Sequence, residues 1–337
     1  MHYLVTGHTG FKGAWLTLLL EARGHRVSGL SLDPMAGSLY EIADNASTLA
    51  FDLRVDIRDR DATLAAVAEV APDVVIHLAA QALVRRSYID PRETIETNVI
   101  GTMNMLEAVS RQPSVLAHVV ATTDKVYRNV EQEKGYVESD PLGGDDPYSA
   151  SKAMADLLTQ SWVASFPGTP TGIVRAGNVI GGGDVSADRL LPDLINAHAT
   201  GHVPELRYPA SVRPWQHVLD CLNGYLTLAD ALLTGEGDGV WNFGPGRGSF
   251  VDVGTVADLV SELFESKVRW RPDDGDHPHE AGLLSLDASK AESLLGWSNR
   301  LGFKEAVAWT VEWARATHNG EDPREVTLRQ IVEFEQL

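Results

Sequence analysis

The sequence predicts an α/β protein with a doubly wound parallel sheet and a smaller C-terminal domain. Short apolar runs alternate with helical patterns through roughly the first 180 residues, and this alternation is typical of βαβ units with right-handed crossovers. A glycine-rich turn, GHTGFKG, joins the first apolar run to the first helical pattern. After residue 180 the alternation gives way to Gly-, Pro- and Asp-rich loops among shorter helices.

Each expected strand is an apolar run between turn residues, and each expected helix carries the periodic apolar positions of a helix. In chain order the expected strands are HYLVT, RVSGLSLD, LAFDLRVD, DVVIHLAA, VLAHVVATT, TGIVRAGNVIG and GVWNFGPG. The expected helices run from Phe11 to about Arg23, near 61–70, near 93–111 and through YSASKAMADLLTQSW.

The strand GVWNFGPG lies within the loop-rich half, so we expect the chain to cross back to the sheet at least once. We assign residues 1–177 and about 212–245 to a Rossmann domain. Residues from about 178 to 211 and from 246 to 337 are assigned to a smaller domain over the carboxyl edge of the sheet. Open α/β sheets bind their ligands at this edge.

The composition limits the partners of the chain. Apolar residues make up 44% of the 337 residues, enough for a full core, and the net charge of −19 should repel nucleic acid and anionic membranes. Cys221 is the single cysteine, which excludes an intrachain disulfide and argues against a structural zinc site. MHYLVTGHTG indicates a strand and a turn rather than a signal peptide, and AWLTLLLEA is too short to span a bilayer. We therefore expect a cytoplasmic protein.

The turn GHTGFKG predicts a dinucleotide site. Gly7, Gly10 and Gly13 stand at three-residue intervals between a strand and a helix, where glycines permit a tight turn and close approach of the backbone to a pyrophosphate at the helix N-terminus. Asp33 follows the next strand, 20 residues past Gly13, the position of a carboxylate that binds the adenosine ribose. Because Pro34 and not an arginine follows Asp33, the sequence favours NAD over NADP.

A second group of residues predicts proton-transfer chemistry. Tyr148 and Lys152 are four residues apart and share one helix face, where the ammonium would lower the pKa of the phenol. The strand VLAHVVATT ends at Thr123, and the acid Asp124 and the base Lys125 follow directly in TTDKVY. Elsewhere such a pair would indicate only a solvated turn. At the carboxyl end of a buried parallel strand it predicts acid–base chemistry.

Several motifs carry a family resemblance over nearly the whole chain. GHTGFKG, HLAA, TNVIGT, TTDKVY, YSASK and DASKAESLLGW resemble those of extended short-chain dehydrogenases/reductases that act on nucleotide sugars. HLAAQALVRRSY, YVESDPLGGDDPYSASK, RAGNVIGGGD, DRLLPD and RPWQHVLD resemble the CDP-glucose 4,6-dehydratase branch of that family. The related dTDP-glucose dehydratases carry Asp-Glu in place of Asp124-Lys125. This chain departs from the CDP-glucose dehydratase motifs at two positions: Val126 stands where Cys is common, and Val185 where Trp is common. The loss of the Trp weakens the assignment of a cytidine base more than that of the reaction.

The resemblance implies a redox-neutral dehydration of CDP-glucose with tightly bound NAD. Tyr148 would take the proton of the sugar 4-hydroxyl, Thr123 would bind O4, and Lys152 would bind the nicotinamide ribose. Asp124 would then protonate the leaving 6-hydroxyl. Lys125 would either remove the C5 proton as a neutral amine or stabilise the enolate as an ammonium. An ion pair between Asp124 and Lys125 would count against the acid role.

The full set of candidate binding residues is larger. The cofactor site is expected to include, besides the residues above, Phe11, Lys12, Asp56, Ile57, Leu78, Ala79, Ala80 and Thr122. The expected substrate site contains Gln81, Arg86 (one of the pair Arg85–Arg86), Asn178, Arg189, Arg213 and His279. The two histidines in DHPHE, residues 276–280, lack a third metal ligand, so no metal site is expected.

Two other functions remain open at this point. A nucleotide-sugar 4-epimerase would use Tyr148 and Lys152 without an acid–base pair after Thr123, and a dehydratase could act on a dTDP or UDP sugar. A non-catalytic NAD sensor would be expected to lack the Tyr-Lys pair, which this chain keeps. Family members usually pair through two helices, so a homodimer or a dimer of dimers is expected through helices near 93–111 and 149–165.

Overall fold

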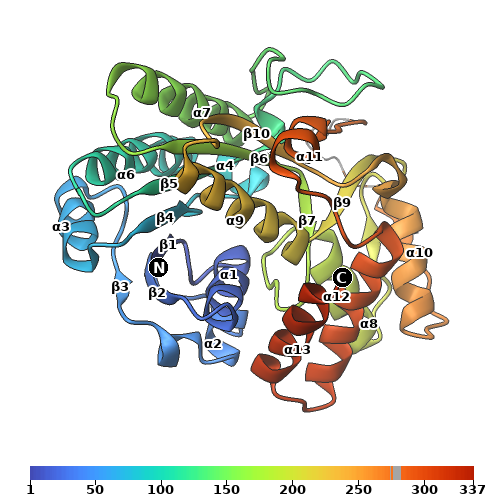
Figure 1. Cartoon of the computed structure of the whole chain (residues 1–337). Coiled ribbons are helices and arrows are strands. Elements are labelled where there is room, and N and C mark those ends of the chain that lie inside the picture. The colour runs from blue at the N-terminus through green and yellow to red at the C-terminus, as the bar shows by residue number, and fades with distance from the viewer. Residues whose placement is uncertain (274, 276–281) are drawn as a thin grey trace.

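A computed structural model describes residues 1–273, 275 and 282–337, and its main feature is a seven-stranded parallel sheet (Figure 1). The strand order is β10-β6-β5-β4-β1-β2-β3, which is the doubly wound arrangement that the sequence predicts. The strands are β1 (His2–Thr6), β2 (Arg26–Ser31), β3 (Asp52–Arg54), β4 (Val74–His77), β5 (Ala117–Thr123), β6 (Thr171–Ala176) and β10 (Gly239–Phe243).

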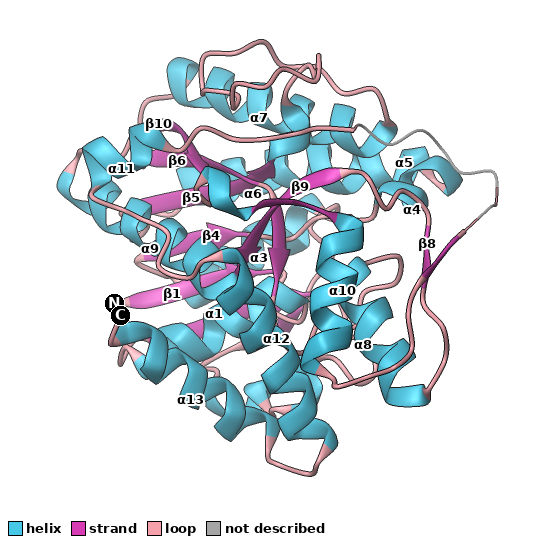
Figure 2. Cartoon of the chain, turned by 90° about the vertical axis from the view of Figure 1, so that its right-hand side faces the viewer, coloured by secondary structure: helices cyan, strands magenta, loops and turns pink. Residues whose placement is uncertain are grey.

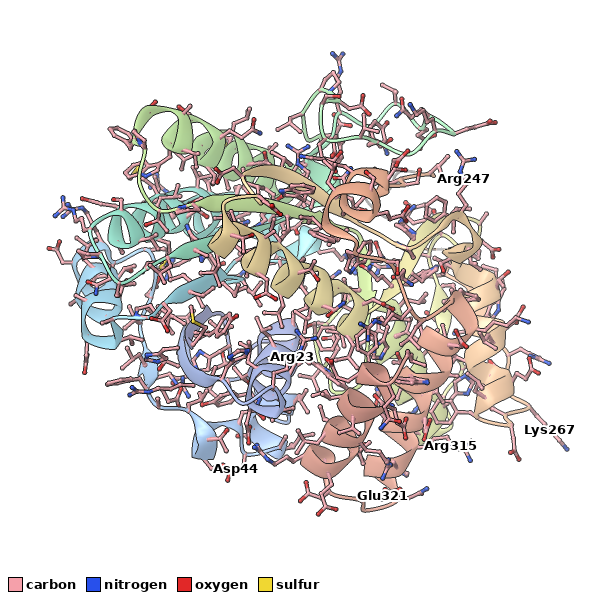
Figure 3. The ribbon with its side chains drawn as sticks, viewed as in Figure 1. Arg23, Asp44, Arg247, Lys267, Arg315 and Glu321 are labelled. Carbon is pink, nitrogen blue, oxygen red and sulfur yellow. The ribbon has the colours of Figure 1, made fainter. Side chains whose placement is uncertain are left out.

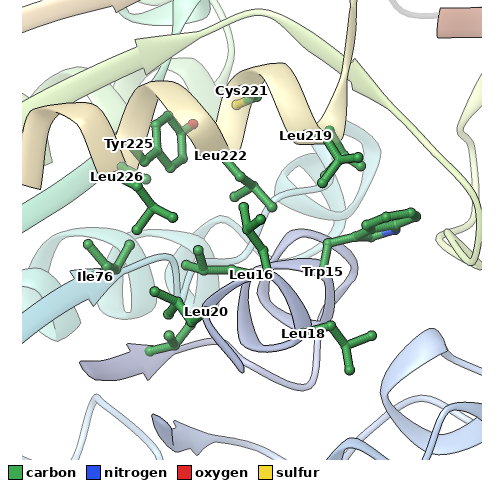
Figure 4. Close-up of a cluster of buried hydrophobic side chains, with 14 of the residues drawn as sticks. Trp15, Leu16, Leu18, Leu20, Ile76, Leu219, Cys221, Leu222, Tyr225 and Leu226 are labelled. Atoms are coloured by element: carbon green, nitrogen blue, oxygen red, sulfur yellow. The ribbon is translucent and has the colours of Figure 1, made fainter. Parts of the chain in front are cut away.

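Helices cover both faces of this sheet because successive side chains of a strand point to opposite faces. Tyr3 and Val5 of β1 join one buried cluster with α1 (Phe11–Ala22) and α9 (Val218–Thr234), and Figure 4 shows apolar side chains of these two helices in that cluster. Leu4 joins a separate cluster with α3 (Arg60–Val70) and α6 (Gly101–Ser110). The other helical segments before residue 101 are α2 (Leu39–Ile42), η1 (Asn45–Thr48), α4 (Val84–Ile89), α5 (Pro91–Ile95) and η2 (Glu96–Ile100).

Helix α7 (Pro147–Ser165) begins where local sequence dictates. The carboxylate of Asp146 accepts a hydrogen bond from the backbone N–H of Ser149 at 2.9 Å, and Pro147 occupies the first turn, where its missing N–H costs nothing. The start of α7 thereby places Tyr148 and Lys152 in its first two turns, and both side chains are buried.

The smaller part of the molecule is built around a second sheet (Figure 2). Strand β9 (Val212–His217) pairs with β7 (Asn178–Ile180) and β11 (Phe250–Asp252). Residues 212–217, which the sequence analysis assigned to the Rossmann domain, thus form the central strand of this second sheet. The other elements are η3 (Asp124–Val126), α8 (Leu190–Thr200), β8 (Glu205–Leu206), η4 (Arg247–Ser249), α10 (Val253–Leu263), β12 (Arg271–Pro272), α11 (Ser289–Leu295), α12 (Phe303–His318) and α13 (Pro323–Glu335).

The C-terminal helix returns to the Rossmann domain. Phe334 of α13 is fully buried in the same cluster as Tyr3 and Val5 of β1, and Arg324 donates two hydrogen bonds of 2.6 Å to the carboxylate of Glu21 on α1. The last helix therefore packs against α1 and β1 of the large sheet.

The surface matches the acidic, charged composition. Asp44, Lys267, Arg315 and Glu321 are exposed, and Figure 3 shows their side chains at the periphery. Within residues 1–273, 275 and 282–337, we find no helix whose length and apolar character would allow it to cross a membrane.

Gly13 gives a test of how tightly the first turn packs. A Cβ at this position would overlap the carbonyl oxygen of Gly7, so we expect Gly13→Ala to lower the free energy of unfolding by about 1–3 kcal/mol, despite the better helix propensity of alanine. Urea unfolding followed by tryptophan fluorescence measures this change. The control is Gly168→Ala, where a Cβ meets no atom within 4 Å. Equal stability of both variants would contradict the close approach.

Candidate active site

A cleft of about 910 Å³ opens at the carboxyl ends of the parallel strands. Gly7 after β1, Leu78 after β4, Thr123 at the end of β5 and Ala176 at the end of β6 all line it. The smaller domain supplies the facing wall, with Asn178, Arg189, Arg207, Arg213 and Trp215 among its residues. This is the edge at which the sequence analysis expected the ligands.

The glycine-rich turn forms a cradle that fits a dinucleotide pyrophosphate. Gly7 has a φ of +72°, and a Cβ there would lie 2.8 Å from the backbone nitrogen of Ala79. Gly10 caps α1, whose N-terminus faces the cleft with unpaired N–H groups. The expected cofactor residues that line the cleft are Gly7, Gly10, Phe11, Lys12, Gly13, Asp56, Ile57, Leu78, Ala79, Ala80, Thr122 and Tyr148.

Asp33 lies in a different electrostatic setting from the one expected. Its side chain is 90% exposed, and Nε of Arg54, from β3, lies 3.5 Å from its Oδ1. The sequence showed no arginine next to Asp33, because Arg54 comes from the neighbouring strand. Arg54 is itself bound by Asp52, whose Oδ2 accepts a hydrogen bond of 2.9 Å from Nη2. Asp33 thus remains available at the end of β2 with a partly neutralised charge.

Tyr148, Lys152 and Thr123 lie together at the end of β5. The ammonium of Lys152 donates a hydrogen bond of 2.7 Å to the carbonyl oxygen of Ala121, and burial together with the charge of Lys12 lowers its pKa to about 8. Burial raises the pKa of Tyr148, while the charge of Arg189 and a hydrogen bond with Thr123 oppose this rise. Burial therefore favours the neutral phenol of Tyr148.

Asp124 is the most unusual group in the cleft. Its side chain is 1% exposed; its Oδ1 accepts a hydrogen bond of 2.9 Å from Thr123, and its Oδ2 has no hydrogen-bond partner. Burial raises the pKa of this carboxyl, and the charges of Lys125 and Arg213 oppose the rise without cancelling it. Among the described residues, no ion pair joins Asp124 to Lys125, so the contact that would argue against an acid is not observed.

A small residue makes room for this carboxyl. A Cβ at Gly177 would lie 3.2 Å from Oδ2 of Asp124 and 2.8 Å from Cγ of Pro214. The RAG motif carried this signal in the sequence, although Gly177 was not among the predicted site residues. Lys125 is half-buried and lines the cleft next to Asp124.

The predicted substrate residues divide into two groups. Asn178, Arg189 and Arg213 line the cleft, and Nη2 of Arg189 donates to the carbonyl oxygen of Ala82 at 3.2 Å, which joins the two domains. Arg213 is buried, and its Nη1 donates to the carbonyl oxygen of Val212 at 2.9 Å. His279 lies outside the described residues.

The structure does not bring Gln81 and Arg86 into the cleft. The amide of Gln81 is held by Thr94 at 2.8 Å and by the backbone of Leu83 at 2.7 Å. Arg86 points outward, where its Nε donates to Glu93 at 2.9 Å. Neighbouring residues of a helix diverge by about 100°, and on α4 it is Arg85 that lines the cleft.

Asp188 and Arg207 are among the charged residues of the cleft that the sequence analysis did not include. Oδ1 of Asp188 forms an ion pair with Nη1 of Arg85 at 2.8 Å and a longer one with Nη1 of Arg207 at 3.7 Å. Asp188 has a φ of +59°, an uncommon conformation outside glycine. No sequence spacing indicated that Arg207, from the loop after β8, meets Arg85 of α4. Within the described residues, no group of three or more His, Cys, Asp or Glu side chains is placed to hold a metal ion.

Comparisons with known proteins agree with this geometry. Residues 3–244 match the family described as the NAD dependent epimerase/dehydratase family. The CDP-glucose 4,6-dehydratase of Salmonella typhimurium is 42% identical over 98% of this chain and 95% of its own length. The dTDP-glucose 4,6-dehydratase of Mycolicibacterium smegmatis is 31% identical over 97% of each chain.

A solved crystal structure has a fold similar to that of this chain. The crystal structure of DesIV, a dTDP-glucose 4,6-dehydratase from Streptomyces venezuelae with NAD bound, is similar with a TM-score of 0.84 and 27% identity, and the match covers 96% of this chain and 100% of that one. These matches confirm the resemblance and the fold class that the motifs indicated. The chain belongs to the NAD-dependent epimerase/dehydratase family.

Proposed function

We propose that this chain is a hydro-lyase that converts a nucleoside-diphosphate hexose to its 4-keto-6-deoxy derivative with bound NAD. CDP-D-glucose is the proposed substrate and CDP-4-keto-6-deoxy-D-glucose the product. The observation that carries the proposal is the buried Asp124 carboxyl, whose pKa is raised by burial, between Thr123 and Lys125 at the end of β5. The 42% identity to a CDP-glucose 4,6-dehydratase supports the same reaction.

The cofactor would be held by groups already described. The backbone of the turn from Gly7 to Gly13, which lines the cleft, would hold the pyrophosphate. The exposed Asp33 after β2 would bind the adenosine ribose, and Lys152, buried on α7, would bind the nicotinamide ribose. NAD, when bound, would supply the acceptor for a hydride from sugar C4 and the donor of a hydride to C6.

The first proton transfer is assigned to Tyr148. Its phenol must lose its own proton before it can accept one from the sugar 4-hydroxyl, and the charge of Arg189 and the hydrogen bond with Thr123 favour the phenolate. Thr123, hydrogen-bonded to Tyr148, would hold O4 in place. This arrangement is shared by oxidoreductases and epimerases of the same fold, so it does not by itself indicate dehydration.

Loss of water is assigned to the next two residues. The C4 ketone acidifies the hydrogen on C5; Lys125 would remove it, and the protonated Asp124 would donate a proton to the departing 6-hydroxyl. Lys125 is proposed as the base because its amine lines the cleft directly beside Asp124. A 4-epimerase needs neither group, which disfavours that alternative.

Cations in the cleft would bind the substrate diphosphate against the acidic background of the protein. Arg189 and Arg213 line the wall formed by the smaller domain, with Asn178 beside them. Arg85 replaces Arg86 in this proposal because it is the member of the pair that lines the cleft. A planar guanidinium suits a phosphate because it can donate two parallel hydrogen bonds.

We also propose a cytoplasmic homodimer. Ile95 of α5, Ile100 of η2, and Met154 and Leu157 of α7 are exposed apolar side chains on helices that contact one another. A contiguous exposed apolar surface of this kind typically marks an interface with another protein. These helices are the ones that the sequence analysis proposed for pairing.

Separate incubation with CDP-glucose, dTDP-glucose and UDP-glucose tests the function. We expect mass spectrometry to show loss of one water from CDP-glucose, with no net reduction of NAD. Dehydration of dTDP-glucose or UDP-glucose alone would keep the reaction and change the proposed nucleotide base. We would then attribute the different base to Val185, which stands where Trp is common. Inversion at C4 without loss of water would contradict the proposal.

Asp124→Asn separates the two half-reactions. Because general acid catalysis typically contributes 10²–10⁴-fold, we expect water loss to slow by about that factor while oxidation at C4 proceeds. Rapid mixing with substrate would then show reduced nicotinamide accumulating in the variant and not in the parent enzyme. Equal slowing of both steps would contradict the acid role.

The same variant should change stability with pH. The pKa of Asp124 is raised in the folded state, so the ionised carboxylate weakens folding as the pH rises above the unfolded value of about 3.9. Asp124→Asn should therefore be more stable than the parent at pH 7, and the difference should vanish towards pH 4. Asp61→Asn is the control, because that side chain is 91% exposed. A constant difference over this range would contradict the burial of a neutral acid.

Lys125→Arg and Lys125→Met together test the base. A guanidinium keeps the charge and cannot accept a proton at neutral pH, so we expect both variants to oxidise C4 and to lose exchange of the C5 proton with deuterated solvent. Retention of this exchange in Lys125→Arg alone would assign the lysine to enolate stabilisation instead.

Leu157→Glu tests the dimer. A charge in the centre of the apolar surface should convert the protein to a monomer in sedimentation velocity. Val332→Glu, an exposed apolar site on α13, should keep the oligomeric state of the parent. A monomeric parent protein would refute the proposed pairing.

A further inference from the structure

A buried hydrogen-bonded network lies behind the turn that carries Asp124 and Lys125. Arg175 of β6 binds Asp156 of α7 through two hydrogen bonds of 2.8 Å, and both side chains are essentially inaccessible to solvent. Nη1 of Arg175 donates to the hydroxyl of Tyr127 at 2.9 Å, and this hydroxyl donates to Oδ1 of Asn242 on β10 at 2.7 Å. The strand order places β10, β6 and β5 side by side at this end of the sheet (Figure 1).

Tyr127 closes the turn itself. Its backbone nitrogen donates to the carbonyl oxygen of Asp124 at 3.3 Å, which completes the single turn η3. The Asp124 carboxyl has its one hydrogen bond with Thr123, and Lys125 lines the open cleft. The turn is therefore held at its ends, by Thr123 in β5 and by Tyr127, rather than through its two reactive side chains.

At the Tyr127 end, buried packing and hydrogen bonds hold the side chain in one position. The ring is 1% exposed, stacks on Tyr136 at a centroid distance of 5.1 Å and lies 4.8 Å below the guanidinium of Arg175. Asn242 is fully buried, and its Nδ2 donates to the carbonyl oxygens of Tyr136 and Asp287. A fully satisfied polar network in a low-dielectric interior is rigid.

Tyr148 and Lys152 are held differently. Both sit in the first two turns of α7, whose start is set by the Asp146 cap and Pro147. Loss of the Tyr127 hydroxyl removes no hydrogen bond from either residue, and the bidentate pair between Arg175 and Asp156 is kept. Thr123 is hydrogen-bonded to both Asp124 and Tyr148, so the Tyr127 hydroxyl, which bonds neither Tyr148 nor Lys152, is the contact specific to the turn.

We propose that the Tyr127 hydroxyl, held by Arg175 and Asn242, positions the turn that presents Asp124 and Lys125 and so serves the loss of water but not the oxidation at C4. The inference rests on the proposed dehydration. Tyr127 is a positioning residue, because its hydroxyl is turned into the protein toward Arg175 and Asn242. A displacement of about 1 Å at such a group typically costs about 10²-fold in rate.

Tyr127→Phe tests this role. We expect C4 oxidation to stay within about 3-fold of the parent and the loss of water to slow at least 10-fold, so that reduced nicotinamide accumulates transiently on mixing with CDP-glucose. Hydrogen–deuterium exchange, which needs no substrate, should be faster in the peptide that spans residues 122–128. The control is Thr327→Val, which removes a buried hydroxyl that accepts from Nε1 of Trp313 at 2.8 Å, far along the chain on α13. It should lower stability without changing the ratio of the two steps.

The outcomes separate this inference from the proposed function. If the parent enzyme dehydrates its substrate and Tyr127→Phe slows both steps equally, or neither, the positioning role is wrong and the function stands. If the parent dehydrates no nucleotide sugar, the proposed function fails, and unchanged exchange at residues 122–128 then also refutes the anchoring of the turn. If Tyr127→Phe speeds hydrogen–deuterium exchange at residues 122–128 but does not slow the loss of water, Tyr127 anchors the turn without serving the loss of water.

Discussion

This site depends on one constraint: several ionisable side chains are buried at the carboxyl ends of the strands. A buried charge is costly, so the pKa of each side chain depends on the partners that the fold places beside it. Asp156 is paired with Arg175 through two hydrogen bonds behind the site. Asp124 has one hydrogen bond and no ion pair within the described residues, and burial raises the pKa of its carboxyl. The same sheet edge thus holds a buried ion pair and a buried carboxyl with a raised pKa.

The fold creates this environment by joining two sheets at one cleft. Strand β5 is buried along its whole length, so Thr123 and Asp124 emerge beneath the smaller domain rather than into solvent. Gly177 leaves room for the carboxyl, and Arg213 reaches the same place from β9. Loss of a hydroxyl requires an acid that is still protonated after C4 has been oxidised, and the proposed mechanism assigns this role to Asp124.

The sequence was sufficient for features that are local in the chain. The seven strands, the glycine turn, the helix that carries Tyr148 and Lys152 and the position of Asp124 at a strand end all followed from periodicity and spacing. Contacts between distant segments could not be predicted in this way. Arg54 reaches Asp33 from the next strand, Arg85 rather than its neighbour lines the cleft, and the amide of Gln81 is consumed by its own loop. Residues 212–217 pair with β7 and β11, which lie before and after them in the chain, so their place in the second sheet also depends on distant contacts.

The protonation state of Asp124 tests this account most directly. Infrared difference spectra of the parent protein and Asp124→Asn, recorded about two pH units above the ordinary aspartate value of about 3.9, report the carbonyl stretch of a protonated carboxyl. We predict that the parent shows this band, that the variant lacks it, and that it disappears only at higher pH. A parent protein whose Asp124 is already a carboxylate at that pH would contradict the central claim, because no proton would then be available for the departing hydroxyl.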